Sequence, residues 1–527
     1  MTGRLKDSFS FWDLGVLLIC VVFTLIKLPF LGLPYFWDEA WVYAPAVLDM
    51  LQNGPSLSPD SINPLLSRGH PILFHFLATC WMSIFGSSFV SAHSFSVFMA
   101  LMLIISVYKL GESLHSKSIG FWAAFLLAVQ PIFIQQAGFL LPEITLAVFV
   151  ALTVKAFIEK KKWMFLLAAT CMLLTKETGI LVIGILGLVD LADVVRSKNL
   201  SVSRLIQTIW IGSPVLLAFG YFLIQYFQFG WFMFPEHVSM FDTEPETWSV
   251  KFKLVFSSLI LEQERGMLVS LAFGAAALGW RKAPTILRAL FLFCFLTFMT
   301  MDGLNSWLPE WYFYYVFPVI LLTAFVWTGA LLFKAGTKNH LFFPFTGLII
   351  LAMLAFTSAH FVIGRYLIYL IPLLLLSLIL ILRQSFKNSN WMFNFIMIST
   401  SLIFYHLANR ADHEMNQYDN MRYVNQISVL QNGIAYLEQN TEFNTECFAG
   451  SFLIHQAMVF PNQGYISEDN RPECVNNHVA PNVNYVMMLS YEIDAGIEWV
   501  KTDGNFEQVF VETLGGHTVW VYKRIGG

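Results

Sequence analysis

The chain has 527 residues, of which 57% are hydrophobic and 13% charged, and Phe alone occurs 51 times. A soluble domain carries about 25% charged residues, so this composition excludes an ordinary soluble protein and is typical of a polytopic membrane protein. The net charge of −4 provides no basic face for nucleic acid.

The first apolar stretch, residues 14–31, follows Arg4 and Lys6 and resembles a signal peptide. No small-residue cleavage site follows it, and many more apolar segments do. We therefore expect an uncleaved first membrane helix.

Apolar stretches long enough to cross about 30 Å of hydrocarbon recur from residue 11 to about residue 408. Basic short loops stay in the cytoplasm, and six breaks between the stretches are basic: Lys109/Lys117, Lys160/Lys161/Lys162, Arg196/Lys198/Arg204, Arg281/Lys282/Arg288, Lys334/Lys338 and Arg383/Lys387. All six basic breaks face the cytoplasm, together with the N-terminus, only if the short apolar segment 71–85 does not cross the membrane.

We expect that segment to be an interfacial or re-entrant helix on the outer side. The 13 predicted spans are 11–31, 89–110, 119–135, 143–159, 163–175, 179–195, 205–227, 266–280, 286–301, 312–332, 341–360, 366–382 and 391–408.

An odd number of spans places the C-terminus outside. From about residue 410 the sequence becomes polar and Asn-rich, with a predicted helix at 421–439, a strand at 484–490 and a hairpin at 509–524. The predicted organisation is a transmembrane domain, 1–409, with an outer loop at 32–88, and a small periplasmic α/β domain, 410–527. Cys447 and Cys474 are the only cysteines of that domain, and an oxidising compartment favours a disulfide between them.

Ionisable residues in a membrane protein indicate function by default, and on this topology the unusual ones lie at the outer ends of the spans. They are Asp38, Glu39, Arg68, His70, Glu143, Lys176, Glu177, His237, Arg265 and Arg365. A transporter would place its coupling residues near the midplane of the membrane. The pattern instead favours an enzyme that acts on a lipid-linked substrate.

Six short motifs occur in a characteristic order along the first 380 residues. They are the acid pair in "FWDEAW", Gly69-His70-Pro71, "FLLPEITL", "LLTKETG", "PEHVSMF" and "RYLIYLIP". Together the motifs resemble the GT-C fold glycosyltransferases, specifically the branch of protein O-mannosyltransferases and lipid A aminoarabinose transferases. Pro45 departs from the pattern, because it interrupts the helix expected after the acid pair.

The resemblance implies an all-α polytopic membrane domain of the GT-C fold, with about 13 transmembrane helices and a small C-terminal α/β outer domain. It implies a hexosyl- or pentosyltransferase of a bacterial inner membrane. Such an enzyme transfers a sugar with inversion from a polyprenyl (undecaprenyl) phosphate carrier to a glycan, lipid or protein acceptor on the outer face. The alternatives are a multi-spanning lipid or polysaccharide transporter or flippase, and a non-catalytic scaffold for the outer domain.

The acceptor hydroxyl must lose its proton as it attacks the anomeric carbon, and a carboxylate within hydrogen-bond reach accepts it. The resemblance assigns this base to Asp38, with Glu39 and Glu143 as further catalytic carboxylates that position the acceptor. The structural alternatives are an N-cap for Asp38 and a favourable first-turn acid for Glu143.

The leaving group is an anionic polyprenyl phosphate, which cations must stabilise. The candidates are His70, Lys176 and Arg365, with Tyr366 next to the arginine. Snorkelling to the interface and a local pair between Lys176 and Glu177 are the alternatives.

A divalent metal is left open as a cofactor, with His237 and Glu236 as candidate ligands. An aromatic cluster at one outer helix start fits an interfacial belt better than a sugar platform. It comprises Trp307, Trp311, Tyr312, Tyr314 and Tyr315.

Overall fold

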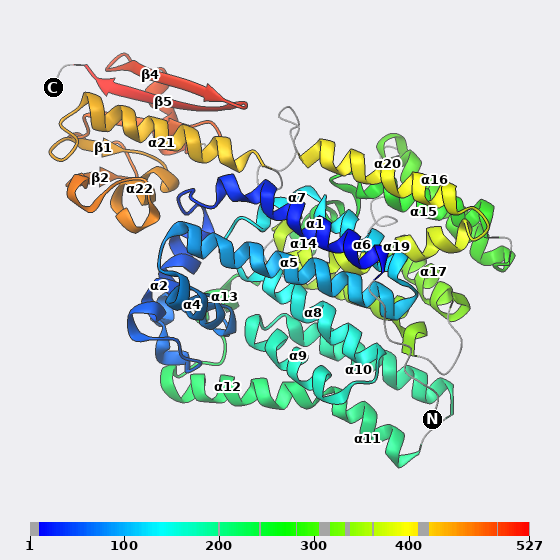
Figure 1. Cartoon of the computed structure of the whole chain (residues 1–527). Coiled ribbons are helices and arrows are strands. Elements are labelled where there is room, and N and C mark those ends of the chain that lie inside the picture. The colour runs from blue at the N-terminus through cyan, green and yellow to red at the C-terminus, as the bar shows by residue number, and fades with distance from the viewer. Residues whose placement is uncertain are drawn as a thin grey trace.

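A computed structural model of the chain describes residues 10–198, 201–241, 244–280, 282–304, 317–332, 338–360, 363–408, 421–492 and 494–525. A large helical domain and a small α/β domain lie end to end (Figure 1). The predicted fold class, a helical apolar domain followed by a C-terminal sheet domain, is confirmed.

Each of the 13 predicted spans contains a helix. Two of them contain a pair of α-helices, and Pro131 and Pro214 stand at the breaks, where a residue without an N–H is tolerated in a first turn. The helices in these ranges are α1 (Phe11–Lys27), α5 (Phe89–Leu114), α6 (Lys117–Ala128), α7 (Pro131–Gln136), α8 (Pro142–Ile158), α9 (Lys162–Thr175), α10 (Gly179–Arg196), α11 (Val202–Ile211), α12 (Ser213–Phe229), α15 (Arg265–Gly279), α16 (Thr285–Leu304), α17 (Phe317–Leu332), α18 (Phe342–Ser358), α19 (Ile371–Ser385) and α20 (Asn390–Ala408).

Within the described residues, five helical segments are long and apolar enough to cross a membrane. The segment containing α19 is 89% buried in its most apolar window, whereas that containing α11 and α12 is only 17% buried. Apolar residues on the outside of a helical bundle match a lipid surround. The chain is thus a multi-pass membrane protein with α19 near its centre and α12 at its edge.

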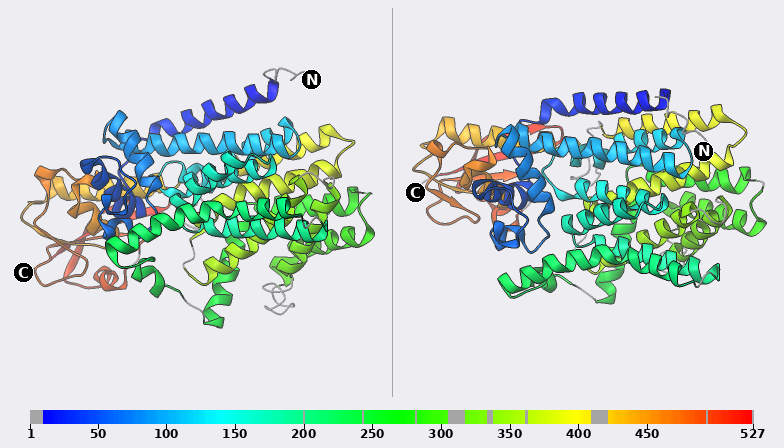
Figure 2. Two further views of the ribbon diagram at one scale, coloured as in Figure 1. Left: turned by 90° about the horizontal axis from the view of Figure 1, so that it is seen from below. Right: turned by 60° about the horizontal axis from the view of Figure 1, so that its bottom comes forward.

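The segment after α1 folds into short helices that gather beside the C-terminal domain (Figures 1 and 2). These are η2 (Glu39–Tyr43), α2 (Ala44–Asn53), η3 (Pro59–Ser61), α3 (Pro64–Ser67) and α4 (Leu73–Phe85). Helix α4 has 13 residues, about as many as α6 and α9, which lie in predicted spans. Its length therefore does not decide whether it crosses, and that stays a prediction.

The expectation that Pro45 interrupts the helix after the acid pair is wrong. One π-turn, η2, runs directly into α2, and Pro45 lies in the first turn of α2.

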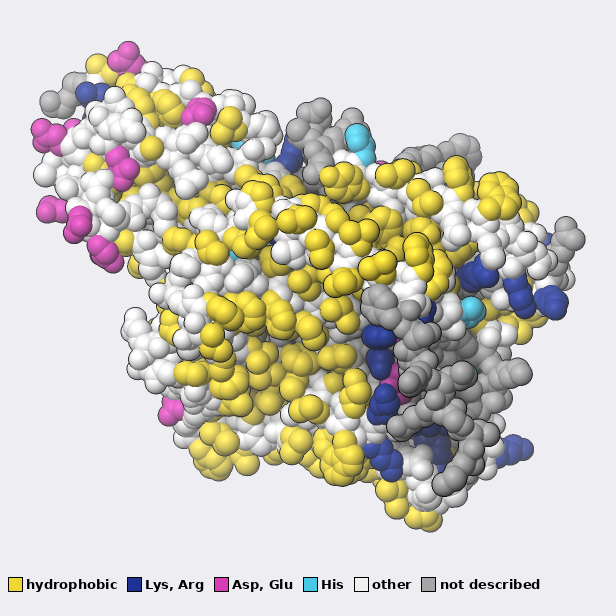
Figure 3. Space-filling model, in the orientation of Figure 1, with side chains coloured by type: hydrophobic (Ala, Val, Ile, Leu, Met, Phe, Trp, Pro, Cys, Tyr) yellow, Lys and Arg dark blue, Asp and Glu magenta, His cyan; other side chains and the backbone are white. Residues whose placement is uncertain are grey.

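Charged side chains divide along the long axis of the molecule. Lys and Arg gather at the end of the helical domain far from the C-terminal domain, whose surface carries most of the visible Asp and Glu (Figure 3). This division agrees with the predicted orientation, which places the basic loops in the cytoplasm and the C-terminal domain outside.

The C-terminal domain is a five-stranded sheet of order β2-β1-β3-β5-β4 packed with helices. Strand β1 is parallel to β2 and β3, and β5 is antiparallel to β3 and β4. The elements are α21 (Tyr423–Asn440), β1 (Cys447–Ala449), α22 (Phe452–Val459), η8 (Pro461–Gln463), β2 (Cys474–Asn476), β3 (Tyr485–Leu489), α23 (Ala495–Glu498), β4 (Phe506–Leu514) and β5 (His517–Arg524). The predicted helix, strand and hairpin are all present.

The predicted disulfide is also present. Strand register sets Cys447 opposite Cys474, with their Cα atoms 4.6 Å apart, and the two are bonded. The other four cysteines, in the helical domain, are free.

Candidate active site

A cavity of about 280 Å³ opens at the end of the helical domain nearest the C-terminal domain. Segments far apart in sequence supply its polar side chains: the loop before η2, the turn before α4, the start of α8, the α9–α10 turn, α13 (Pro235–Ser239) and the stretch between α18 and α19. The polar residues are Asp38, Arg68, His70, Glu143, Lys176, Glu177, Thr178, His237, Thr357, His360 and Tyr366. Six predicted site residues therefore meet in one cavity.

Asp38 faces this cavity from the N-cap position of η2, but its side chain makes no cap hydrogen bond. One carboxylate oxygen accepts a hydrogen bond from Trp41 Nε1 at 3.1 Å, and the other forms an ion pair with the Arg365 guanidinium. The carboxylate is therefore oriented by the site and not by the helix end.

Glu39 does not line the cavity. It is fully buried, and it accepts a hydrogen bond from Leu140 N–H at 2.6 Å and lies 2.9 Å from His93 Nε2. The other ring nitrogen of His93 is 2.8 Å from the Leu31 carbonyl, so an imidazolium satisfies both acceptors. The two acids of the pair thus lie in different environments, and Glu39 ties the loop to α5 and to the segment before α8.

Glu143 connects two cations. It follows the N1 proline of α8 and is 1% exposed, with Oε1 3.1 Å from Lys176 Nζ and 3.8 Å from Arg365 Nε. The Lys176 ammonium also lies 3.9 Å from the centre of the Tyr366 ring. Two of the predicted cations, Lys176 and Arg365, thus form one buried ionic network with Glu143.

The charge of this network follows from its contacts. Burial alone would lower the pKa of Lys176, but the Coulombic attraction of Glu143, Tyr366 and Glu177 raises that pKa overall. Arg365 keeps its proton as every guanidinium in a protein does, and it lies beside two carboxylates. Both cations are therefore charged at neutral pH.

A histidine cluster forms the other wall. His70 Nδ1 is 3.1 Å from Glu177 Oε2, so Glu177 pairs with His70 and not with Lys176. The rings of His70 and His237 lie 4.8 Å apart. Burial, with a further contribution from His70, lowers the pKa of His237 to about 4, which leaves it neutral at pH 7.

Glu236 is exposed and does not line the cavity. Across the part of the chain that the structure describes, no three His, Cys, Asp or Glu side chains are grouped so that they could hold a metal ion. The predicted aromatic cluster at residues 307–315 lies outside the described residues.

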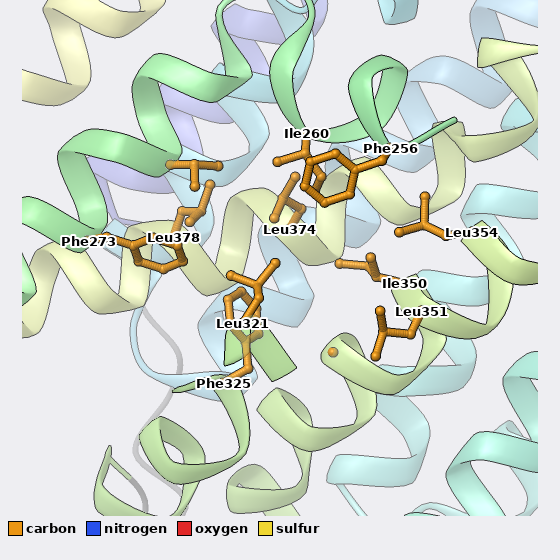
Figure 4. A pocket seen from close by; sticks show the side chains of 12 residues that line it. Phe256, Ile260, Phe273, Leu321, Phe325, Ile350, Leu351, Leu354, Leu374 and Leu378 are labelled. Carbon is orange, nitrogen blue, oxygen red and sulfur yellow. The ribbon is translucent and has the colours of Figure 1, made fainter. Parts of the chain in front are cut away.

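A second cavity of about 360 Å³ adjoins the first and shares His70, Glu177, Thr178 and His237 with it. Its remaining walls are almost entirely apolar and come from α9, α10, α12 and residues 232–234. A polar compartment is therefore continuous with an apolar one. A third gap, of about 20 Å³, lies deep in the bundle and is lined only by apolar side chains and one glycine, so it provides no groups for chemistry (Figure 4).

Sequence reasoning missed two site residues, His93 and His360. Each is a single histidine at or near the outer end of an apolar segment, which is the signal that would have found them. Arg68 was noted only as an outer charge, and its guanidinium stacks 4.3 Å from the centre of the Trp41 ring.

Part of the chain is similar to a known family. The model of the dolichyl-phosphate-mannose-protein mannosyltransferase family matches residues 69–219, which confirms the predicted family over that range. No curated protein matches the chain. Among solved structures, the ArnT protein from Cupriavidus metallidurans bound to undecaprenyl phosphate is similar at 13% identity and a TM-score of 0.43, with 96% of this chain and 97% of that chain covered. The archaeal oligosaccharyltransferase AglB from Archaeoglobus fulgidus, in complex with an inhibitory peptide and a dolichol-phosphate, is similar at 14% identity and a TM-score of 0.41, with 91% and 70% covered.

Proposed function

We propose that this protein transfers a sugar, with inversion, from a polyprenyl phosphate carrier to an acceptor on the outer face of the membrane. The observation that carries this proposal is the pair of joined cavities. One is ionic and is lined by Asp38, Glu143 and the buried Lys176, and the other is apolar and large enough for part of a lipid chain. Arg365 is not among the lining residues, but it forms ion pairs with both acids.

The apolar cavity suits the first isoprene units of the carrier, because burying apolar surface is favourable by about 25 cal/mol per Å². The carrier's phosphate would then lie where the two cavities meet, beside His70 and within reach of Lys176 and Arg365. These groups would stabilise the charge that grows on the phosphate as the bond to the sugar breaks. Arg365 offers a planar fork for phosphate oxygens, and Lys176 offers a point charge.

Asp38 would act as the general base. The acceptor hydroxyl attacks the anomeric carbon, its proton passes to the Asp38 carboxylate, and the bond from the anomeric carbon to the phosphate oxygen breaks. Polyprenyl phosphate leaves with the bonding electron pair, and the configuration at the anomeric carbon inverts. Glu143 would position the acceptor and hold the two cations, and Glu39 would hold the loop that carries Asp38.

A transporter or flippase is the second candidate function. The ionic groups described here gather at one end of the bundle and not near its middle, where a transport site is expected. The match to a mannosyltransferase family also supports transfer over transport.

The test uses purified protein in detergent or nanodiscs with a radiolabelled polyprenyl-phosphate sugar. Release of polyprenyl phosphate together with a labelled product, abolished in Asp38→Asn, is the expected result. Movement of intact labelled donor between leaflets of a proteoliposome, without cleavage, would instead establish the transporter.

A further inference from the structure

One glutamine of the C-terminal domain forms hydrogen bonds to the loop that carries Asp38. Gln463 ends the short helix η8 and is 3% exposed. Its backbone carbonyl accepts a hydrogen bond from Tyr35 N–H at 3.0 Å, and its side-chain Nε2 donates to the Ala40 carbonyl at 3.4 Å. A single residue thus binds the backbone on both sides of Asp38.

The Ala40 carbonyl needs this outside donor because of the local sequence. In the π-turn η2 the Glu39 carbonyl accepts a hydrogen bond from the Ala44 N–H, five residues later. For Ala40 the fifth residue onward is Pro45, which has no N–H. A buried carbonyl without a partner is costly, and Gln463 supplies the partner that the turn lacks.

Aromatic contacts form the rest of the interface between the C-terminal domain and the Asp38 loop. Phe452 meets Trp41, the residue that donates to Asp38, at 5.5 Å between ring centres, and Tyr491 meets Phe36 at 6.3 Å. Gly464, with φ of +93°, leaves room for Phe89, which a Cβ at that position would meet at 2.4 Å. The C-terminal domain is therefore fitted closely to the loop and to the helix behind it.

We propose that Gln463 is a positioning residue through which the C-terminal domain holds the Asp38 loop in its working geometry. The expected effect of Gln463 on turnover rests on the proposed function. Its expected effect on the order of residues 35–44 does not. Displacing a catalytic group by about 1 Å can cost about 10²-fold in rate, so loosening the loop should reduce kcat. The apolar cavity should stay intact, because none of residues 35–44 lines it.

The test is Gln463→Met, which keeps the length of the side chain and removes its donor. Hydrogen exchange should become faster in residues 35–44 and stay unchanged in the sheet of the C-terminal domain. In the transfer assay kcat should fall at least ~10-fold, with KM for the lipid donor changed less than ~2-fold, since the expected loss is one of positioning. Gln426→Met is the matched control, because Gln426 is a fully buried glutamine of the same domain whose side-chain amide hydrogen-bonds to none of the described residues.

Adding Pro45→Ala to Gln463→Met restores an N–H that can reach the Ala40 carbonyl, so exchange and kcat should both move back toward the parent values. Unchanged exchange in residues 35–44 of Gln463→Met would overturn the proposal, and so would faster exchange with normal kcat. If the parent protein transfers no sugar but Gln463→Met still loosens the loop and Pro45→Ala tightens it, then the positioning role stands and the proposed function fails.

Discussion

At the scale of single residues, the acid pair shows what one sequence can and cannot reveal. The sequence predicted a catalytic Asp38, and the structure places it in the cavity beside Arg365. From the sequence, the role of Glu39 could not be distinguished from that of Asp38, because the partners of Glu39, His93 and Leu140, lie 54 and 101 residues away along the chain. Adjacent residues on a helical turn point in different directions, so proximity in sequence did not mean a shared role.

The first prediction concerns Asp38. Asp38→Asn keeps the size of the side chain and the acceptor for Trp41, but it cannot take a proton, so turnover should fall about 10²–10⁴-fold. Transfer kinetics and a thermal unfolding curve measure the effect. Asp60→Asn, an exposed acid of the same outer loop, should leave turnover unchanged. Near-normal turnover in Asp38→Asn would contradict this prediction and would indicate that Glu143 is the general base.

The second prediction concerns pH. Unfolded histidine has a pKa near 6.5, whereas the pKa of His237 is about 4 because of burial and the nearby His70. Between these values the unfolded chain binds more protons, so the free energy of unfolding should fall as the pH drops from about 6.5 to about 4. His237→Gln should reduce that loss by about 1 kcal/mol, since partial exposure screens the charge. Thermal unfolding of both proteins at pH 5 and pH 7 checks this, and identical pH dependence in the two would contradict it.

At the scale of elements, long apolar segments were predictable and short elements were not. All 13 predicted ranges contain helices, because membrane helices are recognisable by length and hydropathy. Strands β1 and β2 escaped prediction because three residues are too few to show alternation. The π-turn at η2 escaped because the donor that completes it, Gln463, comes from another domain.

The third prediction concerns the packing of α5 against α6. A Cβ on Gly120 would lie 2.1 Å from the Tyr108 carbonyl oxygen, a backbone atom that cannot move aside cheaply. Gly120→Ala should therefore destabilise the protein by about 1–3 kcal/mol. Gly184→Ala in α10, where a Cβ meets nothing within 4 Å, should be neutral or slightly stabilising. Thermal unfolding in detergent compares the two variants, and equal stability would contradict the close approach of α5 and α6.

The fourth prediction concerns the disulfide. Cys447 and Cys474 are 27 residues apart, and closing such a loop contributes about 3 kcal/mol in the chain-entropy model. Cys447→Ser with Cys474→Ser should lower the stability of the C-terminal domain by about that amount. Denatured, unreduced parent protein should show four reactive thiols, matching the four free cysteines. A count of six would reject the bond.

At the scale of the whole molecule, the sequence predicted the order of the parts but not how they meet. Basic loops and the acidic C-terminal domain lie at opposite ends, as the predicted topology would require (Figure 3). The contact between the C-terminal domain and the Asp38 loop had no signal in the sequence, because a buried glutamine looks like any polar surface residue. Such an interface depends on the complementary shapes of the two surfaces, and these shapes cannot be predicted from local hydrophobic periodicity.

The last prediction is the membrane orientation that this arrangement implies. Ser116 lies in the turn between α5 and α6, at the basic end of the bundle, and Ser467 lies on the C-terminal domain. If α4 does not cross the membrane, two spans precede Ser116 and 13 precede Ser467, so Ser116 is cytoplasmic and Ser467 is outside. Ser467→Cys in intact cells should react with a membrane-impermeant maleimide, above the background of the parent, and Ser116→Cys should react only after permeabilisation. The reverse pattern, with Ser116→Cys labelled in intact cells and Ser467→Cys protected, would require α4 to cross, and it would place the C-terminal domain on the side opposite to that at which the acceptor is proposed to arrive.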